Sequence, residues 1–214
     1  MKIVLLVGLA HSVELMAPEE YQFMKYISDH GRNYPTKEEY KFRLGLFKER
    51  LQKYSEHNSN PNKTFTVGVN HFSDRTKEEI DVYRGYIPDK TYKKNIWSFP
   101  EEAMADSINW VEKGAVTKIK DQGACGSCWT FSAAGTMESN HFIASGLLFD
   151  LSEQNFVDCV YHSKKEYHSG CHGGQMRRAL TYAETHPLMT LHDYPYTAET
   201  WEGECKYQKK MGAV

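Results

Sequence analysis

The first third of the sequence carries hydrophobic residues at the spacing of α-helices. Pro18 stands where the first turn of a helix tolerates proline, and Glu19 and Glu20 follow it in that turn. Gly31 supplies a residue at which this helix can end. The apolar stripe of the predicted helix consists of Phe23, Met24 and Ile27.

A longer helix is predicted next. Thr36 and Glu39 form a capping box, in which the threonine oxygen accepts from an orphan amide and the glutamate reaches back to the helix start. Residues 57–61 end the helix, and residues 64–69 have the pattern of a strand. One helix face is formed by five residues at alternating spacings of four and three, namely Tyr40, Leu44, Phe47, Leu51 and Tyr54.

A third helix is predicted to begin at Cys128, because Gly126 and Ser127 favour a turn just before an apolar run. A thiol is a poor nucleophile until it ionises, and the unpaired amides of a helix N-terminus stabilise an anion. Cys128 is therefore a candidate nucleophile. Gln122, six residues earlier, is suited to donate its side-chain amide to a developing oxyanion, beside the Cys128 amide. The apolar run consists of Trp129, Phe131, Ala133, Ala134 and Met137.

Composition and charge narrow the classes of protein. The chain has 214 residues, 40% of them hydrophobic and 25% charged, which fits one ordinary folded domain and a smaller one. The formal net charge is -2, so no basic excess exists to attract nucleic acid or an anionic membrane. Residues 3–10 form an apolar run after Lys2, too short to span a bilayer and typical of a secretory signal. Residues 1–15 are therefore expected to be a signal peptide.

The cysteines leave two alternatives open. Their number is five, so at least one thiol has no intramolecular partner. Cys125 and Cys128 form a C-x-x-C pair, which also occurs in redox proteins and as half of a zinc site. Cys159, Cys171 and Cys205 contain no second close pair, which disfavours tetrahedral zinc. More than a hundred residues precede the motif, whereas a thioredoxin motif lies near the start of a small α/β domain.

The string Cys125-Gly126-Ser127-Cys128-Trp129 is the complete signature around the nucleophile of papain and the cathepsins. Other stretches also resemble papain-like cysteine peptidases, in particular the cathepsin L-like branch. The resemblance extends from about residue 17 to residue 207. The matching stretches are residues 106–110, 113–117, 151–154, 157–159, 170–174 and 194–196.

The first module resembles the inhibitory propeptide of these enzymes. Its long helix matches four of the six positions of the spacing E-x3-R-x3-F-x2-N-x3-I-x3-N, and Arg50 and Tyr54 depart from the usual Asn and Ile. The second propeptide motif, G-x-N-x-F-x-D, is matched throughout. In this family the propeptide places an extended segment in the cleft, and this segment runs in the direction opposite to that of a bound substrate. The resemblance implies that residues 83–99 form this segment. The matching residues are Glu39, Arg43, Phe47, Asn58, Gly68, Asn70, Phe72 and Asp74.

The resemblance implies a fold of the α+β class. Residues 16–103 would be a mainly helical propeptide domain, and residues 104–214 the helical half of a papain-like peptidase, with the β-barrel half largely absent. Gly173 and Gly174 would present their backbone to an extended substrate, since glycine has no side chain to block close approach. Met176 would help to line a substrate pocket.

The resemblance also implies a disulfide pairing, Cys125 with Cys171 and Cys159 with Cys205, which leaves Cys128 free. Two disulfides fit a secretory route that ends in a lysosome or vacuole or outside the cell, because a reducing cytosol rarely keeps them. We expect a monomer without metal, cofactor, nucleic-acid partner or membrane span. Residues 62–64, Asn-Lys-Thr, form the only N-glycosylation sequon in the sequence.

A cysteine peptidase also needs a base that takes the thiol proton and protonates the leaving amine. In this family the histidine and its orienting asparagine lie roughly 130–150 residues beyond the nucleophile, whereas Val214 lies 86 residues beyond Cys128. We therefore expect a truncated zymogen of a cysteine endopeptidase, inactive by itself, whose substrates are peptides and proteins and whose propeptide inhibits it. The alternative is a propeptide-type inhibitor or decoy of related peptidases.

Overall fold

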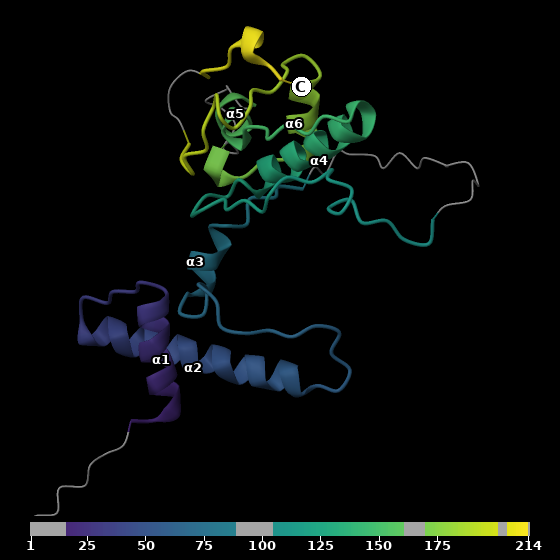
Figure 1. Ribbon diagram of the computed structural model, residues 1–214. Helices are drawn as coiled ribbons and strands as arrows, with labels where there is room; N and C mark the ends of the chain where they lie inside the picture. The colour runs from purple at the N-terminus through teal and green to yellow at the C-terminus, as the bar shows by residue number, and fades with distance from the viewer. Residues whose placement is uncertain (1–15, 89–104, 161–169, 201–204, 214) are drawn as a thin grey trace, which may run out of the picture. The chain divides into compact units, whose positions relative to one another are not determined.

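The structure is a computed structural model that describes residues 16–88, 105–160, 170–200 and 205–213. The expected signal peptide and residues 89–99 of the expected cleft segment lie outside the described residues. Figure 1 shows the order of the helices along the chain. They are α1 (Pro18–Asp29), α2 (Lys37–Ser59), α3 (Lys77–Asp81), α4 (Cys128–Ser145), α5 (Glu153–Cys159) and α6 (Met176–Ala183), with 3-10 turns at Gly170–His172 and Lys209–Met211.

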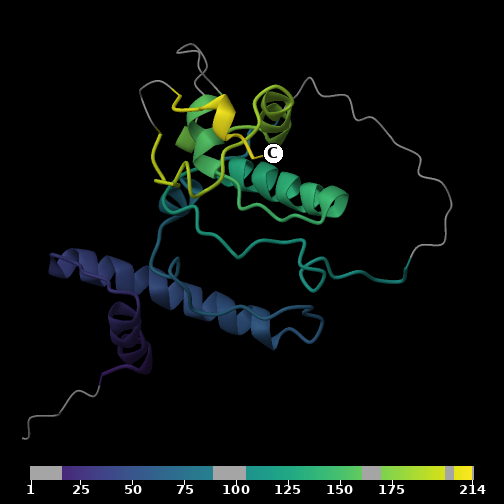
Figure 2. The same cartoon turned by 45° about the horizontal axis from the view of Figure 1, so that its top comes forward.

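The chain divides into two units between Lys77 and Glu78. In the first unit, α1 crosses α2, as Figures 1 and 2 both show. Phe23, Tyr26 and Phe47 are its buried core. The prediction for α1 was wrong at one position, because Met24 is 48% exposed whereas Tyr26 is 2% exposed. Tyr26 lies one turn after Phe23 on the face that meets α2, and its hydroxyl finds an acceptor there.

Helix α2 begins where the capping box predicts. The Thr36 side chain accepts a hydrogen bond from the Glu39 amide at 3.1 Å. The Glu39 carboxylate instead accepts from Arg43 Nε, 2.6 Å away, so only the threonine half of the box has its predicted partner. Four of the five residues of the predicted helix face are confirmed, since Phe47 is buried and Tyr40, Leu44 and Leu51 pack around the same core. Tyr54 lies outside this core, and its hydroxyl is 3.1 Å from the Ser73 hydroxyl.

Residues 64–69 are not a strand, contrary to the prediction. The Asn58 side chain takes the place of a partner strand, because its oxygen accepts from the Val67 amide at 2.9 Å and its nitrogen donates to the Val67 carbonyl at 2.7 Å. A single side-chain amide therefore satisfies both backbone groups that a ladder would have used.

A buried carboxylate organises the first unit. Asp74 is 1% exposed and accepts hydrogen bonds from the hydroxyls of Tyr26 at 2.6 Å and Tyr34 at 2.8 Å. Arg32 Nε lies 3.4 Å from the same carboxylate. Burial raises the pKa of Tyr26 to about 12, and the hydrogen bond to Asp74 acts in the same direction. The Tyr26 hydroxyl consequently stays a donor over the whole ordinary pH range.

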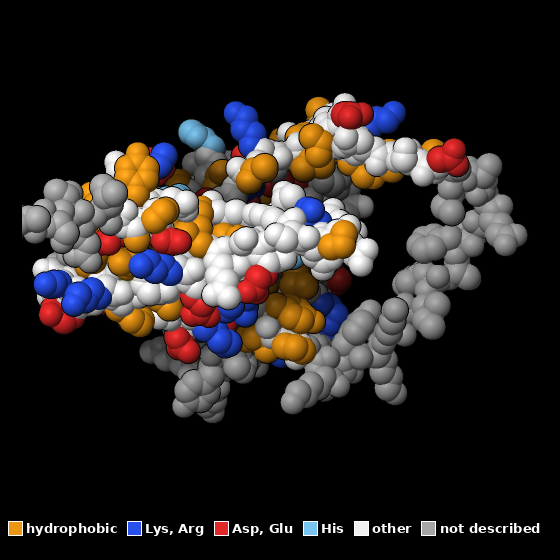
Figure 3. All heavy atoms as spheres, turned by 90° about the horizontal axis from the view of Figure 1, so that it is seen from below, with side chains coloured by type: hydrophobic (Ala, Val, Ile, Leu, Met, Phe, Trp, Pro, Cys, Tyr) orange, Lys and Arg blue, Asp and Glu red, His pale blue; other side chains and the backbone are white. Residues whose placement is uncertain are grey.

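The core of the second unit is built on α4. Trp129, Ala133 and Ala134 of this helix are buried against Phe156 of α5 and Ala179 of α6. Figures 1 and 2 show α4 beside α5 and α6. On the face shown in Figure 3, hydrophobic side chains lie at the surface among charged ones. Exposed apolar side chains concentrate between residues 105 and 121, namely Ile108, Trp110, Val111, Val116 and Ile119.

A second charge cluster, centred on the half-buried Lys120, ties the segment before α4 to the helices. Lys120 Nζ contacts carboxylate oxygens of Glu138 at 3.0 Å, of Asp150 at 2.6 Å and of Glu153 at 2.6 Å. Burial alone would lower the pKa of Lys120, but the hydrogen bonds to three carboxylates outweigh it and raise the pKa above its ordinary value. The chain two residues before Gln122 is thereby fixed to α4 and α5.

The described residues contain isolated β-bridges rather than strands. Tyr86 pairs in parallel with Gly174, and Leu151 pairs antiparallel with Thr190. A further antiparallel bridge joins Met189 to Gly212. A helical first unit and a helical second unit with such bridges agree with the expected propeptide and helical half of a papain-like fold.

We predict that Asp74→Ala destabilises the first unit by about 3–5 kcal/mol, because it leaves the buried Tyr26 hydroxyl and the half-buried Tyr34 hydroxyl without their acceptor and the half-buried Arg32 without its carboxylate. The measurement is amide hydrogen exchange in α1 and α2. Asp29→Ala is the matched control, since Asp29 forms an ion pair with Lys25 that is open to solvent. Equal protection of the helices in the two variants would contradict the role given to Asp74.

Candidate active site

Cys128 is the first residue of α4, and its thiol is free and half-buried. The turn before it is tight, because the Ser127 carbonyl accepts the Thr130 amide at 2.8 Å and the Phe131 amide at 3.5 Å. Ser127 makes no side-chain cap for the helix. The first amides of an 18-residue helix are therefore directed toward the end at which the Cys128 sulfur lies.

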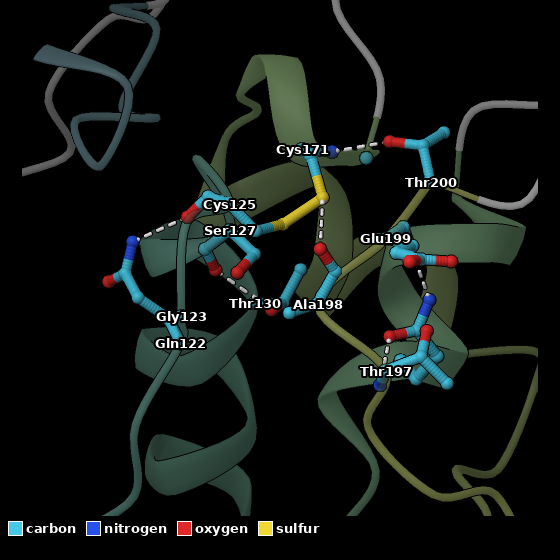
Figure 4. The surroundings of a disulfide bond; sticks show 12 residues. Gln122, Gly123, Cys125, Ser127, Thr130, Cys171, Thr197, Ala198, Glu199 and Thr200 are labelled. Atoms are coloured by element: carbon cyan, nitrogen blue, oxygen red, sulfur yellow. Dashed lines mark hydrogen bonds between the residues drawn. A yellow bond between two sulfur atoms is a disulfide. The ribbon is translucent and has the colours of Figure 1, made fainter. Parts of the chain in front are cut away.

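Two disulfides join the remaining cysteines, Cys125 with Cys171 and Cys159 with Cys205. They are the pairs that the resemblance implies. The first holds the 170–174 loop against the turn that carries Cys128, and the Gly126 amide donates to the Cys171 carbonyl at 2.8 Å beside it. Figure 4 shows the Thr200 hydroxyl at the Cys171 amide on the other side, 2.8 Å away.

The Gln122 side chain lies beside the turn at residues 125–128, which we call the nucleophile turn. Its amide nitrogen donates to the Cys125 carbonyl at 2.6 Å, as Figure 4 shows, and to the Tyr83 carbonyl at 2.9 Å. The Gln122 amide, the candidate oxyanion donor, therefore already binds two carbonyl oxygens. One of them, the Tyr83 oxygen, belongs to the segment just after α3. An amide in this position has the chemistry to stabilise negative charge on a substrate oxygen.

Tyr196 also belongs to this site, although the sequence analysis gives it no role. Its hydroxyl donates to the Gln122 backbone carbonyl at 2.7 Å and lies 2.6 Å from the Ser127 hydroxyl. Burial raises the pKa of Tyr196 above its ordinary value. One phenol thus connects the residue before the nucleophile to the backbone of the oxyanion donor. Tyr196 is part of the Tyr-Pro-Tyr stretch at residues 194–196, and this stretch by itself does not indicate which residues Tyr196 contacts.

Gly174 meets an extended segment through its backbone. Its amide donates to the Gly85 carbonyl at 2.8 Å, and its carbonyl accepts the Ile87 amide at 3.0 Å. A Cβ on Gly174 would lie 2.5 Å from the Trp129 ring, so core packing also requires glycine here. Gly173 has a φ of 113°, and a Cβ on it would lie 2.6 Å from the Gly85 carbonyl oxygen.

Gly85 makes the closest of these approaches. A Cβ on Gly85 would lie 1.6 Å from the Gly126 carbonyl oxygen. Residues 83–87 are thus held on both sides, by Gln122 and Gly126 of the nucleophile turn and by Gly174 of the facing loop. Met176, the first residue of α6, packs partly buried against the Trp129 core.

The residues of the two propeptide motifs meet inside the first unit. Arg43 of α2 pairs with Glu39 and donates to the Asp74 backbone carbonyl at 2.9 Å. Asn70 orders its own loop, because its side chain accepts from the Phe72 amide at 2.9 Å. Gly68 has open space where a Cβ would stand. The hydrogen bond from Arg43 to the Asp74 carbonyl therefore joins α2 to the 68–74 loop.

The described residues include no group of three or more His, Cys, Asp or Glu side chains placed to hold a metal ion. In that same part of the chain, no helix has the length and apolar character that a membrane crossing needs.

Two family models match the chain. Residues 104–214 match the papain family cysteine protease, and residues 23–80 match the cathepsin propeptide inhibitor domain. The peptidase match covers the residues that form the site above. The two matches lie in different parts of the chain, so the chain carries both a peptidase module and a propeptide module.

Individual relatives agree with this assignment. The chain is 38% identical to cysteine proteinase 15A of Pisum sativum and 37% identical to procathepsin L of Rattus norvegicus, with 89% and 90% of this chain covered. It spans about half of these relatives, 54% and 58% of their length.

A solved structure of digestive procathepsin L2 proteinase from the larval midgut of Tenebrio molitor matches with a TM-score of 0.80. The identity is 32%, and the match covers 92% of this chain and 65% of that structure. A family model over more than half of the chain establishes the classification. The chain belongs to the papain family of cysteine proteases and carries a cathepsin-type propeptide inhibitor domain ahead of its peptidase residues.

Proposed function

We propose that the protein to which this chain belongs is the zymogen of a cysteine endopeptidase. The Cys128 thiolate would attack the carbonyl carbon of a peptide bond, and the Gln122 amide and the Cys128 backbone amide would hold the resulting oxyanion. The α4 N-terminus favours the thiolate by its dipole. The base that protonates the leaving amine would be a histidine outside the residues described, since the family places it roughly 130–150 residues after the nucleophile.

The observation that carries the proposal is the pairing of residues 83–87 with the site. An extended segment already binds Gln122 through one carbonyl and Gly174 through a carbonyl and an amide. These are the groups that a peptide substrate would use. The bridge between Tyr86 and Gly174 is parallel, which supports a segment lying backwards relative to substrate, as the family resemblance implies.

The finer assignments are part of the same proposal. Residues 16–103 would be the propeptide domain and residues 104–214 the peptidase domain. Gly173, Gly174 and Met176 would bind the extended substrate, and the zymogen would act as a monomer. The two disulfides support a secretory route with a lysosomal, vacuolar or extracellular destination.

The test is to sequence the reading frame beyond Val214 and to express the protein that it encodes. After removal of the propeptide, we expect hydrolysis of extended peptides, no hydrolysis with Cys128→Ala, and about 10²–10³-fold lower kcat with Gln122→Ala, because one oxyanion donor is lost. Steady-state kinetics on a fluorogenic peptide measures all three. Unchanged activity in the Cys128→Ala protein would refute the proposal.

We predict that Gly85→Ala releases residues 83–87 from the site, because its Cβ has no space beside the Gly126 carbonyl. The Ile87 and Gly174 amides would then exchange with solvent about tenfold faster or more, as expected when hydrogen bonds worth about 0.5–1.5 kcal/mol each are lost together. Gly135→Ala is the matched control, because a Cβ there meets open space. Protected Ile87 and Gly174 amides in the Gly85→Ala chain would show that this segment does not depend on the close approach.

A further inference from the structure

The chain leaves α2 through a tight, ordered turn at residues 60–63. The Lys63 amide donates to the Asn60 carbonyl at 3.2 Å, and the Asn62 amide donates to the Asn60 side-chain oxygen at 2.9 Å. The sequon noted in the sequence begins inside this turn, at Asn62, and ends one residue after it, at Thr64. The sequon therefore follows directly on a helix end and has a defined backbone.

The loop at residues 58–67 is fixed at its base, whereas its tip is exposed to solvent. Asn58 binds both backbone groups of Val67, which joins the two ends of the loop. The His57 ring lies 4.5 Å from the Phe65 ring, centroid to centroid, and its Nε2 is 3.1 Å from the Phe65 carbonyl oxygen. These contacts hold the residues on either side of the sequon without using the sequon itself.

The side chains of the sequon are free to react. Asn62, Lys63 and Thr64 are all exposed. Among the described residues, the side chains of Asn62 and Thr64 make no hydrogen bond. A bulky group on Asn62 would extend into solvent and would displace none of the contacts that build the first unit. Surface loops of secreted proteins are where such groups are tolerated.

We propose that Asn62 is a site of N-linked glycosylation. The Asn62 side-chain nitrogen would form a bond to C1 of the first sugar of a lipid-linked oligosaccharide pyrophosphate. The bond between C1 and the pyrophosphate oxygen would break, the amide would give up one proton, and the lipid pyrophosphate would leave. The Thr64 hydroxyl is the group that the transferring enzyme requires two residues after the acceptor.

This inference rests on the proposed secretory route, because the lipid-linked donor is found in the compartment where disulfides form. The disulfides are an observation independent of the sequon, and they point to that same compartment. The glycan would sit on the propeptide unit. The zymogen would carry it, and the peptidase released from the propeptide would lack it.

The test is expression of the full chain in a eukaryotic secretory cell line, with its own N-terminus and also behind a second, efficient leader. Secreted protein is treated with peptide N-glycosidase, which converts a glycosylated asparagine to aspartate, and is then mapped by mass spectrometry. We expect one step in gel mobility on treatment and conversion of Asn62 alone. Secreted, disulfide-bonded chain with unmodified Asn62 would overturn the proposal.

Variants assign the modification without depending on that map. Asn62→Gln and Thr64→Ala should abolish the mobility step, whereas Thr64→Ser should keep it. Asn33→Gln is the matched control, because Asn33 is exposed but is followed by Tyr-Pro and forms no sequon. Loss of the step in Asn33→Gln, or its survival in Asn62→Gln, would place the glycan elsewhere and overturn the assignment.

The two N-termini separate the site from the route. Glycosylation of both forms supports site and route together. Glycosylation behind the added leader alone supports the site and counts against the proposed secretory route of the natural chain. The peptidase proposal is tested by Cys128→Ala and is unaffected by either outcome.

Discussion

The disulfide between Cys125 and Cys171 is the constraint on which the site depends. It joins the turn before α4 to the 170–174 loop across 46 residues of sequence, with the Cα atoms 4.5 Å apart. With these two backbones side by side, the Gly126 amide reaches the Cys171 carbonyl, and Gly174 lies against the Trp129 ring. The extended segment at residues 83–87 uses both sides, so its binding presupposes the covalent link.

Close approach to glycine backbone characterises this part of the molecule. Gly85, Gly126 and Gly174 each have another group closer than a Cβ would allow. A segment bound in this way is recognised by its extended conformation and by its hydrogen-bonding groups. The same arrangement suits a peptidase, which must bind many sequences, and a propeptide, which must bind the same groups without being cleaved.

Each of the two units also has one charge cluster that organises its polar interior. Asp74 gathers two tyrosines and an arginine in the first unit, and Lys120 gathers three carboxylates in the second. Charges are expensive to bury unless they are paired and hydrogen-bonded, so these clusters specify one arrangement of the elements around them. In the second unit the cluster fixes the chain at Lys120, two residues before Gln122.

The sequence by itself determined α1, α2 and the start of α4, the family signature, and the choice of Cys128 as the candidate nucleophile. These depend on residues close together in the chain: capping at Thr36, the helical period from Tyr40 to Tyr54, and the turn before Cys128. The cysteine pairing followed from resemblance, because spacing alone permits many pairings.

Only the tertiary structure decided the contacts between distant residues. It buried Tyr26 in place of Met24, replaced a predicted strand by the Asn58 side chain, and gave Tyr196 its place between Ser127 and Gln122. Local pattern reports which residues prefer burial or a helix, but it carries no information on which acceptor a hydroxyl or an amide meets 48 or 74 residues away. Those meetings depend on packing, and packing is a property of the whole fold.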